Sequence, residues 1–462
     1  MIDLDAASIA ASVNDQELTA EAVTEAFLDR IVARNPALNA LVRFDPEAAR
    51  REARAVSQRL AGGARLPLAG VPIVIKDNIW VGGRRAAQGS RLFAEFVAPE
   101  DAIGVERLRR AGAVIIGIGN CSEFAAKGVT TNPLFGPTRH PLEPELTPGG
   151  SSGGNATALA ADFAPIALGT DAGGSSRRPP AHTGIVGFKP SLGAIAYGPG
   201  FAEPFWGVSV LAPMGRTVRD VIALFKAIAG PDPRDPESIV IDPPAAFEPS
   251  RLRIAFSPRL GLSVPVDEEV EIAIANAVAR LVMAGWNVCD ADPVWPPEAA
   301  EAGLMPLQHA GLAAIHGAAW KTDPTRFDPD LGAQIERGLT VSGSEVATAL
   351  ETSLLVRRAF AGFFHDVDLL LAPTAPCVAW PLRDLGPKRI GGIEVPPRGH
   401  AVFTPLINHA LAPAISIPCG RGRDGLPVGL QIIARRGAYH RVLAAAAAAE
   451  NLLADMNDYP RC

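Results

Sequence analysis

The chain has no surplus of positive charge and no long apolar run. Among 462 residues, 43 Lys and Arg stand against 49 Asp and Glu, which gives a formal net charge of −6. This balance supplies no basic surface for phosphate groups, so neither nucleic acid nor an anionic membrane surface is expected as a partner. The longest apolar runs, at 412–419 and 444–449, are far shorter than the roughly 20 residues of a membrane-spanning helix.

Cysteine is scarce and scattered. The five cysteines are odd in number and never form a CxxC pair, so they indicate neither a disulfide framework nor a zinc site. The eight histidines form neither HxH nor HExxH, and no metal or organic cofactor is predicted. The amino terminus, MIDLDAASIAASVNDQEL, lacks the positive and apolar regions of a secretory signal. A cytoplasmic protein is therefore expected.

Hydrophobic residues make up 48% of the chain, enough for a large core. Residues 71–75, VPIVI, are typical of a buried strand that ends at Lys76-Asp77. A helix over 101–111 and a strand at 113–118 would complete a strand-helix-strand unit, which indicates the α/β class. Further strands are predicted at 164–168, 184–188, 252–256, 367–372, 413–418 and 428–434. Further helices are predicted at 19–33 (stopped by Asn35-Pro36), 217–229, 267–284, 343–364 and 438–453.

Three segments lack a regular pattern. Residues 128–155 are rich in Gly, Pro, Thr and Ser and predict a long structured loop before a helix from about Asn155 to Ala161. Residues 230–250 carry six prolines and are typical of a connector. Residues 290–342 also lack a regular pattern. We expect variable insertions on the substrate side in the region from about 290 to 345.

The first Gly/Ser cluster, Thr147 to Asn155, allows three interpretations. A phosphate cradle would need Lys and then Ser or Thr after the last glycine, whereas this chain has Asn155 and Ala156. A nucleophile elbow at Gly149-x-Ser151-x-Gly153 would need a strand directly before it, and Glu143 to Pro148 does not resemble one. The third interpretation is a loop that caps the following helix.

The second cluster, Gly169 to Pro179, follows the apolar PIAL segment. Successive glycines let backbone N–H groups point at one spot, as a developing oxyanion requires beside a nucleophile. Ser175 is the natural nucleophile, although an ordinary glycine-rich strand exit explains the pattern equally well when it is taken alone. We expect Asp171 and Arg177 to form an ion pair that fixes this loop.

Taken together, these motifs resemble the amidase signature family. Lys76-Asp77 follows an apolar strand, Ser151 stands 75 residues later, and Asp171-x-Gly-Gly-Ser175 ends 24 residues after that. The carboxy-terminal Gly425-Leu-Pro-Val-Gly-Leu-Gln431 extends the resemblance over most of the chain. It implies one large domain, 1–462, with the core signature at about 70–220 and a twisted mixed β-sheet flanked by helices on both faces.

The resemblance also implies a catalytic triad. Ser175 would be the nucleophile, Ser151 a proton relay on a cis peptide bond, and Lys76 the base. The backbone N–H groups of Ala172, Gly173, Gly174 and Ser175 would hold the oxyanion. For Lys76 to be neutral near pH 7, its pKa must fall from roughly 10.4, at a cost of about 4.6 kcal/mol, and burial beside VPIVI could supply this desolvation.

The expected function is hydrolysis of a small, apolar or aryl amide, carbamate, urea or ester. Phe201, Phe205 and Trp206 could line an apolar pocket, or they could pack their loop onto the core. One alternative is a glutaminase subunit of the amidotransferase type. That branch carries an Asp where this chain has Ala401, which argues against glutamine as the substrate. The resemblance is compatible with a homodimer.

Two further hypotheses remain open. A non-catalytic binding protein could keep the fold, but the intact Lys76, Ser151 and Ser175 argue against it. A Ser-His-Asp hydrolase could use Ser151 with His182 or a later histidine as its base. Substituting Ser151 and Ser175 separately would distinguish that hydrolase from the triad. Departures from the family pattern at Ala172, Ser176 and Arg178 affect the wall beside Ser175.

Overall fold

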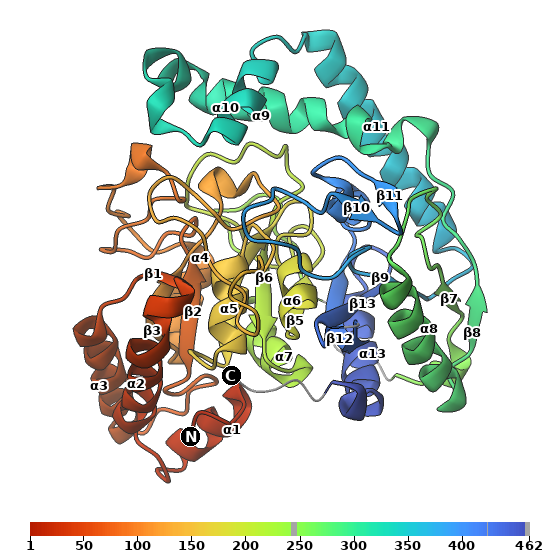
Figure 1. The fold of residues 1–462 in the computed structure, drawn as a ribbon. Coiled ribbons are helices and arrows are strands. Elements are labelled where there is room, and N and C mark those ends of the chain that lie inside the picture. Colours follow the sequence, from red (N-terminus) through yellow and green to blue (C-terminus); the bar gives the residue numbers. More distant parts are fainter. Residues whose placement is uncertain (242–246, 423, 458–462) are drawn as a thin grey trace.

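One mixed β-sheet runs through the molecule (Figure 1). A computed structural model describes residues 1–241, 247–422 and 424–457, and eleven of its strands pair in this sheet. In spatial order they are β1 (Leu41–Arg43), β3 (Val114–Gly119), β2 (Pro72–Lys76), β4 (Ile166–Asp171), β6 (Val210–Gly215), β5 (Val186–Lys189), β12 (Ala414–Arg421), β13 (Pro427–Ile433), β9 (Leu369–Pro373), β7 (Ile254–Phe256) and β8 (Val288–Asp290). A separate hairpin joins β10 (Arg389–Ile390) and β11 (Ile393–Glu394).

The sheet combines parallel and antiparallel pairs, with parallel pairs towards both ends and a run of antiparallel pairs from β4 to β9. β2 is parallel to both of its neighbours, β3 and β4, while β4 pairs antiparallel with β6. The buried apolar residues of β2, β3 and β4 leave no solvent-facing side, as expected for strands covered on both faces. The predicted α/β class with a mixed sheet is confirmed.

Thirteen α-helices surround the sheet in the described part of the chain. They are α1 (Ala6–Asn14), α2 (Ala20–Leu38), α3 (Pro46–Ala61), α4 (Ile103–Ala111), α5 (Gly153–Ala160), α6 (Arg178–Thr183), α7 (Val218–Ile228), α8 (Glu268–Met283), α9 (Glu301–Thr322), α10 (Pro329–Gly338), α11 (Gly343–Phe363), α12 (Pro405–His409) and α13 (Tyr439–Leu452).

Alternation along the strands places helices on opposite faces. On β4, Leu168 faces α4, and the next residue, Gly169, faces Ser152 just before α5. On β5, Gly187 lies against α6, and Phe188 packs edge-on against Phe225 of α7 at 5.3 Å between ring centroids. Because successive side chains of a strand point to opposite faces, α4 and α7 cover one face and α5 and α6 the other.

The variable region is regular, contrary to the sequence-based expectation. Residues 290–342, predicted to be irregular, contain α9 and α10. α9 packs against α10 on one side and α11 on another, so its apolar residues do not gather in one stripe and the helical period is hidden. The described parts of the connector, 230–241 and 247–250, contain no α-helix or strand, and a short 3-10 helix begins at Pro249. Residues 242–246 lie outside the described residues.

The helix predicted at 19–33 is longer than expected. α2 passes through Pro36 and ends at Leu38, with Asn39 in a left-handed conformation at its C-cap. A proline removes its own N–H bond and crowds the carbonyl four residues before it, but only two helical residues follow Pro36, so the disturbance is confined to the last turn. The sequence analysis did not predict the short strand β1, which pairs with β3 at one edge of the sheet, or the strand β6, which lies next to β4.

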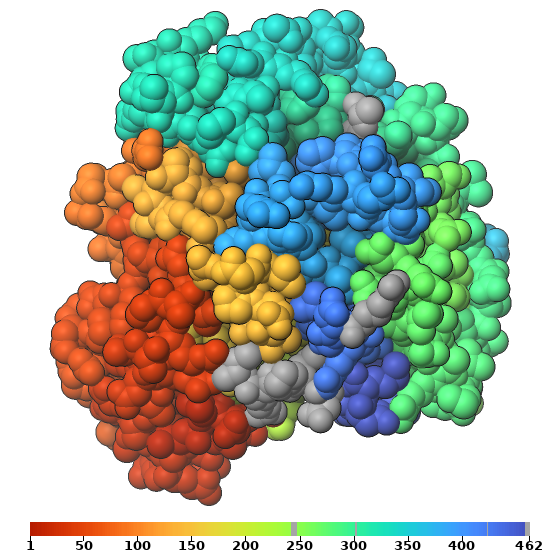
Figure 2. Space-filling model, viewed as in Figure 1, coloured from red at the N-terminus to blue at the C-terminus, as the bar shows by residue number. Residues whose placement is uncertain are grey.

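The helices α9 and α10 form a layer above one end of the sheet (Figure 1), and Figure 2 shows this teal layer at the top of the molecular surface. His316 of α9 stacks on Phe124, with ring centroids 3.8 Å apart, and Lys127 pairs with Asp328 at the start of α10 at 2.5 Å. The layer therefore rests on the loop that follows β3. No helix within the described ranges is long and apolar enough to cross a membrane.

Candidate functional site

Lys76 lies at the carboxyl end of β2, between two parallel neighbours. Its side chain is fully buried, and its Nζ lies 2.7 Å from Ser151 Oγ and 2.9 Å from Thr170 Oγ1. Burial lowers the pKa of Lys76 to about 8, although Cys121 and Asp171 act in the opposite direction. A lysine with this pKa has an accessible neutral form near neutral pH, so it can accept a proton.

Ser151 lies in the loop before α5, on a cis peptide bond with Gly150. A Cβ on Gly150 would come within 2.8 Å of the backbone of Gly128 and Val129, so only glycine fits there. Thr130 Oγ1 donates to the Gly149 carbonyl at 2.9 Å and accepts from the N–H of Gly153 at 2.8 Å. These contacts fix the loop that presents Ser151.

The three predicted triad residues form one continuous hydrogen-bonded chain. Ser151 Oγ lies 2.9 Å from Ser175 Oγ and 2.7 Å from Lys76 Nζ. Ser175 follows β4 and keeps 7% of its surface exposed, whereas Lys76 and Ser151 are fully buried. This chain of hydrogen bonds therefore runs from the interior to Ser175, the residue of the three that solvent can reach.

Asp171 and Arg177 form the expected ion pair inside the loop that holds Ser175, the predicted nucleophile; we call residues 172–177 the nucleophile loop. Arg177 Nε lies 3.0 Å from Asp171 Oδ2, and both side chains are fully buried. Arg177 also donates to Gln431 Oε1 at 2.8 Å and to the Thr404 carbonyl at 3.1 Å. Burial opposes ionisation of Asp171, but the neighbouring Arg177 outweighs it and holds the pKa of this carboxyl below its usual range. The pair ties the nucleophile loop to β13 and α12.

The four predicted oxyanion donors are not equivalent. The N–H of Gly174 already donates to Asp171 Oδ1 at 2.7 Å. In the described part of the chain, the N–H groups of Ala172, Gly173 and Ser175 have no protein acceptor. These three N–H groups can therefore donate hydrogen bonds to a ligand oxygen, while the N–H of Gly174 stabilises the loop.

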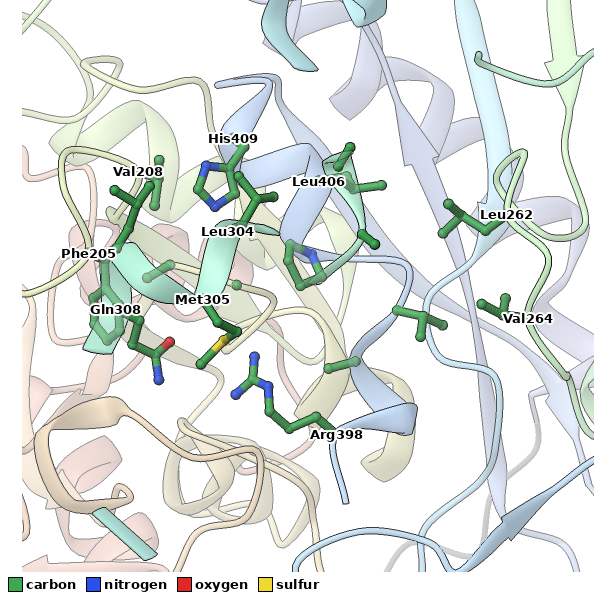
Figure 3. A pocket seen from close by; sticks show the side chains of 18 of the residues that line it. Phe205, Val208, Leu262, Val264, Leu304, Met305, Gln308, Arg398, Leu406 and His409 are labelled. Atoms are coloured by element: carbon green, nitrogen blue, oxygen red, sulfur yellow. The ribbon is translucent and has the colours of Figure 1, made fainter. Parts of the chain in front are cut away.

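A cavity of about 310 Å³ opens beside the nucleophile loop (Figure 3). Ala172 and Gly173 form part of its wall, and the side chains of Leu304, Met305 and Leu406 surround it. Its polar side chains include Gln308, Arg398 and His409. Burial lowers the pKa of His409 to about 4, so this ring is neutral near pH 7. We call this space the large cavity.

A second, much smaller cavity lies at Ser175 itself. It encloses about 20 Å³ and shares Ala172 and Phe205 with the large cavity. Its wall is mostly polar and includes Asn78, Gln88, Thr170, Tyr197, Glu203 and Ser209. Burial raises the pKa of Glu203 to about 7. We call this space the small cavity.

The three aromatic residues predicted to bind substrate occupy different surroundings. Phe205 lines both cavities. Phe201 lines only the small cavity and packs against Trp80, Phe93 and Phe96. Trp206 is 44% exposed, donates its Nε1–H to the Leu307 carbonyl at 2.6 Å, and lines neither cavity. They do not form one aromatic pocket.

No described histidine forms a hydrogen bond with Ser151 or Ser175. His182 is buried edge-on against Trp380, and its Nε2 has no hydrogen-bond partner among the described residues. Burial lowers the pKa of His182 to about 3. The residues before Ser151 form a loop rather than the strand of a nucleophile elbow. The same described ranges contain no cluster of His, Cys, Asp and Glu that could hold a metal ion.

Two polar residues of the site were missed by the sequence analysis. Thr170 accepts hydrogen bonds from Lys76 Nζ and, at 3.0 Å, from Asn78 Nδ2. Thr170 lies one residue before Asp171 on β4, and Asn78 lies two residues after Lys76. Because β2 and β4 are parallel neighbours, polar residues at their carboxyl ends must meet, and this rule could have identified both.

Known proteins resemble this chain over nearly its whole length. The Amidase family model matches residues 22–443. An acylamidase of Rhodococcus erythropolis is 35% identical over 94% of this chain and 92% of its own length. The A-type subunit of the glutamyl-tRNA(Gln) amidotransferase of Symbiobacterium thermophilum is 36% identical over 92% of each chain.

A solved structure extends the likeness to the fold. The crystal structure of a bacterial aryl acylamidase of the amidase signature family superposes with a TM-score of 0.90 at 28% identity, covering 99% of this chain and 98% of its own. The family model, the relatives and the superposition each span nearly the whole chain. The chain therefore belongs to the amidase signature family and is a hydrolase of amide C–N bonds.

Proposed function

We propose that this amidase cleaves a small, apolar or aryl amide through an acyl-enzyme on Ser175. The observation that carries the proposal is the unbroken chain of hydrogen bonds from Lys76 Nζ through Ser151 Oγ to Ser175 Oγ, with links of 2.7 and 2.9 Å. A serine hydroxyl needs a base to accept its proton, and this chain leads that proton to a lysine whose pKa is lowered to about 8.

In the first half of the reaction, the oxygen of Ser175 forms a bond to the substrate carbonyl carbon. Its proton passes to Ser151, and the proton of Ser151 passes to neutral Lys76. The N–H groups of Ala172, Gly173 and Ser175 stabilise the negative oxygen. The C–N bond then breaks, the same relay returns a proton to the leaving nitrogen, and an acyl-enzyme and a free amine result.

In the second half, water takes the place of the amine. The relay accepts a proton from the water while its oxygen bonds to the acyl carbon, and the bond to Ser175 breaks as the proton returns to that oxygen. A carboxylic acid leaves. These steps use only this chain's own residues and water.

The large cavity supports an apolar acyl group. Its volume of about 310 Å³ suits one aromatic ring with a short substituent, and its wall is largely aliphatic. Carbamates, ureas and esters with the same apolar part share the carbonyl that Ser175 attacks. They are therefore included in the proposed substrate range.

The wall of the large cavity does not favour a glutaminase. Ala401 places a methyl group in this wall, and none of the described lining residues is Asp or Glu. The ammonium group of glutamine would therefore find no carboxylate there. A stand-alone amidase is the better fit.

The test is a hydrolysis panel with purified protein. Aryl and alkyl amides, matched esters and carbamates, and glutamine are incubated with the enzyme, and acid and amine release are measured. We expect the enzyme to hydrolyse apolar amides and to hydrolyse glutamine slowly or not at all. The Ser175→Ala variant should hydrolyse neither. Faster turnover of glutamine than of every apolar amide would contradict the proposal.

A further inference from the structure

The small cavity beside Ser175 is rich in hydrogen-bond acceptors. Asn78 Oδ1 is buried there and has no hydrogen-bond partner among the described residues, because the amide of Asn78 is held by its nitrogen to Thr170. The Glu203 carboxyl accepts the N–H of Phe205 at 3.0 Å and that of Gly207, and it has further lone pairs to offer. An unsatisfied buried acceptor costs free energy unless a ligand supplies a donor.

The small cavity also lies at the proton-relay end of the site. Thr170, in its wall, accepts a hydrogen bond from Lys76 Nζ at 2.9 Å and another from Asn78. The leaving nitrogen must take its proton from this relay, so it must lie on the side of Ser175 where Lys76 and Thr170 meet. Ser175 and Thr170 both line the small cavity, whereas the large cavity touches the loop at Ala172 and Gly173 and is lined by neither Ser175 nor Thr170.

The volume of the small cavity limits what can leave through it. About 20 Å³ accommodates one molecule the size of water or ammonia, but no aromatic ring. A methyl group in the small cavity would be small enough, but it has no N–H or O–H group to donate to Asn78 Oδ1 and Glu203. Ammonia matches both the size and the need for N–H groups.

We propose that the substrate is a primary amide with an apolar acyl group: the acyl group occupies the large cavity, and Asn78 and Glu203 receive the departing ammonia in the small cavity. This inference rests on the proposed acyl transfer at Ser175 and adds the class of leaving group. Water then enters the vacated small cavity, where the same acceptors orient it for the second attack.

A pair of reversed amides tests the assignment of the two cavities. Benzamide places a phenyl ring on the acyl side and releases ammonia, whereas acetanilide places the same ring on the amine side and releases aniline. We expect kcat/KM for benzamide to exceed that for acetanilide by at least about tenfold, because only one orientation fits both cavities. Equal values, or faster cleavage of acetanilide, would overturn the inference and leave the proposed function intact.

Hydrolysis of neither amide would also overturn the inference. Labelling of Ser175 by a fluorophosphonate then decides the fate of the proposed function, since that reagent needs an activated serine but no nitrogen leaving group. A labelled Ser175 would keep acyl transfer as the chemistry of the site, and an unlabelled one would exclude it.

The Glu203→Gln variant tests the acceptor role directly. Gln keeps the size of the side chain and an oxygen for the N–H of Phe205, but it removes the ionisable carboxyl and replaces one acceptor oxygen with an N–H donor group. We expect kcat/KM for benzamide to fall about tenfold, while the fluorophosphonate labelling rate changes less than about twofold. Parallel loss of both rates would indicate a structural role and contradict the proposal, as would unchanged benzamide turnover.

Glu298→Gln provides the matched control. Glu298 is exposed and lies next to Ala299 in the wall of the large cavity. The same change of charge at this site should alter neither the benzamide rate nor the labelling rate. A tenfold loss with Glu298→Gln would show that general electrostatics, rather than contact with ammonia, explains the Glu203 result.

Discussion

At the scale of single residues, the environment of Lys76 decides whether it is a base or a permanent cation. The side chain is fully buried at the end of β2, and its two hydrogen-bond partners are the neutral hydroxyls of Ser151 and Thr170. Such partners stabilise an ammonium less than a carboxylate would, so desolvation prevails and lowers the pKa to about 8.

The first prediction is the pH dependence of catalysis. Only neutral Lys76 accepts the proton, so kcat/KM should rise with pH below about 8 and level off above it. Lys76→Met should lower kcat/KM by a factor of roughly 10² to 10⁴, and the residual activity should lose this pH dependence. Steady-state rates between pH 6 and 10 measure both effects. A variant that keeps the wild-type profile would exclude Lys76 as the titrating base.

The second prediction concerns the buried pair of Asp171 and Arg177. Asp171→Asn would leave the guanidinium of Arg177 buried without its counter-charge, which should cost about 3 to 5 kcal/mol of the free energy of unfolding. Thermal unfolding followed by circular dichroism would measure the loss as a lower melting temperature. Ser175 labelling should also slow, because Asp171 accepts the N–H of Gly174 in the nucleophile loop.

A surface pair provides the control for this change. Asp15 and Arg65 lie 2.9 Å apart with exposed side chains. Asp15→Asn should therefore cost at most about 1 kcal/mol. If both variants unfolded at the wild-type temperature, the buried pair would not support the loop in the way described.

At the scale of elements, α9 and α10 connect the variable region to the reacting centre. Leu304, Leu307 and Gln308 of α9 line the large cavity, and His316 stacks on Phe124, which lines the small cavity. Asp328 begins α10: its Oδ1 accepts the N–H of Asp330 at 3.0 Å, and its Oδ2 pairs with the buried Lys127. This one carboxylate both caps the helix and anchors the layer.

The third prediction separates these two roles. Asp328→Asn keeps an oxygen for the helix cap but removes the charge that faces Lys127. Loosening the layer should raise KM about tenfold with a smaller change in kcat, because α9 shapes the binding cavity and makes no contact with the relay. Asp330→Asn is the matched control, since Asp330 is 44% exposed and 3.6 Å from Lys127, and its KM should stay close to wild type. An unchanged KM for Asp328→Asn would contradict the anchoring role.

How far the sequence predicts these elements depends on how each one is buried. β2 and β3 are apolar runs with clear ends, and they lie within one or two residues of the predicted ranges. α9 is surrounded by other helices and carries Pro306 inside it, so neither its period nor its composition distinguished it from a loop. β6 was missed because its residues, VLAPMG, include a proline that is unusual inside a sheet.

The candidate site shows the same division. Lys76, Ser151 and Ser175 could be predicted from the sequence because each lies in a distinctive motif. The cavities are not local features: Asn78, Glu203 and Leu304 come from three distant segments, and only the folded chain brings them near Ser175. Phe201, Phe205 and Trp206 illustrate this: they are neighbours in sequence, yet Phe205 lines both cavities, Phe201 lines only the small one and Trp206 lines neither.

At the scale of the whole molecule, the sheet assembles the relay from segments far apart in the chain. Lys76 lies at the end of β2, and Ser175 lies in the loop between β4 and α6. Gln431 on β13 accepts a hydrogen bond from Arg177 in the same loop. Parallel pairing of β2 and β4 puts both carboxyl ends at one edge, and the loop before α5 brings Ser151 between them. The chemistry therefore depends on the sheet order as much as on the motifs.

The most direct test of this account is to locate the covalent adduct of a fluorophosphonate by peptide mass spectrometry in the wild type, Ser151→Ala and Ser175→Ala. The account predicts an adduct on Ser175 in the wild type, much slower labelling of that residue in Ser151→Ala, and no adduct in Ser175→Ala. An adduct on Ser151 that persists in Ser175→Ala would contradict it.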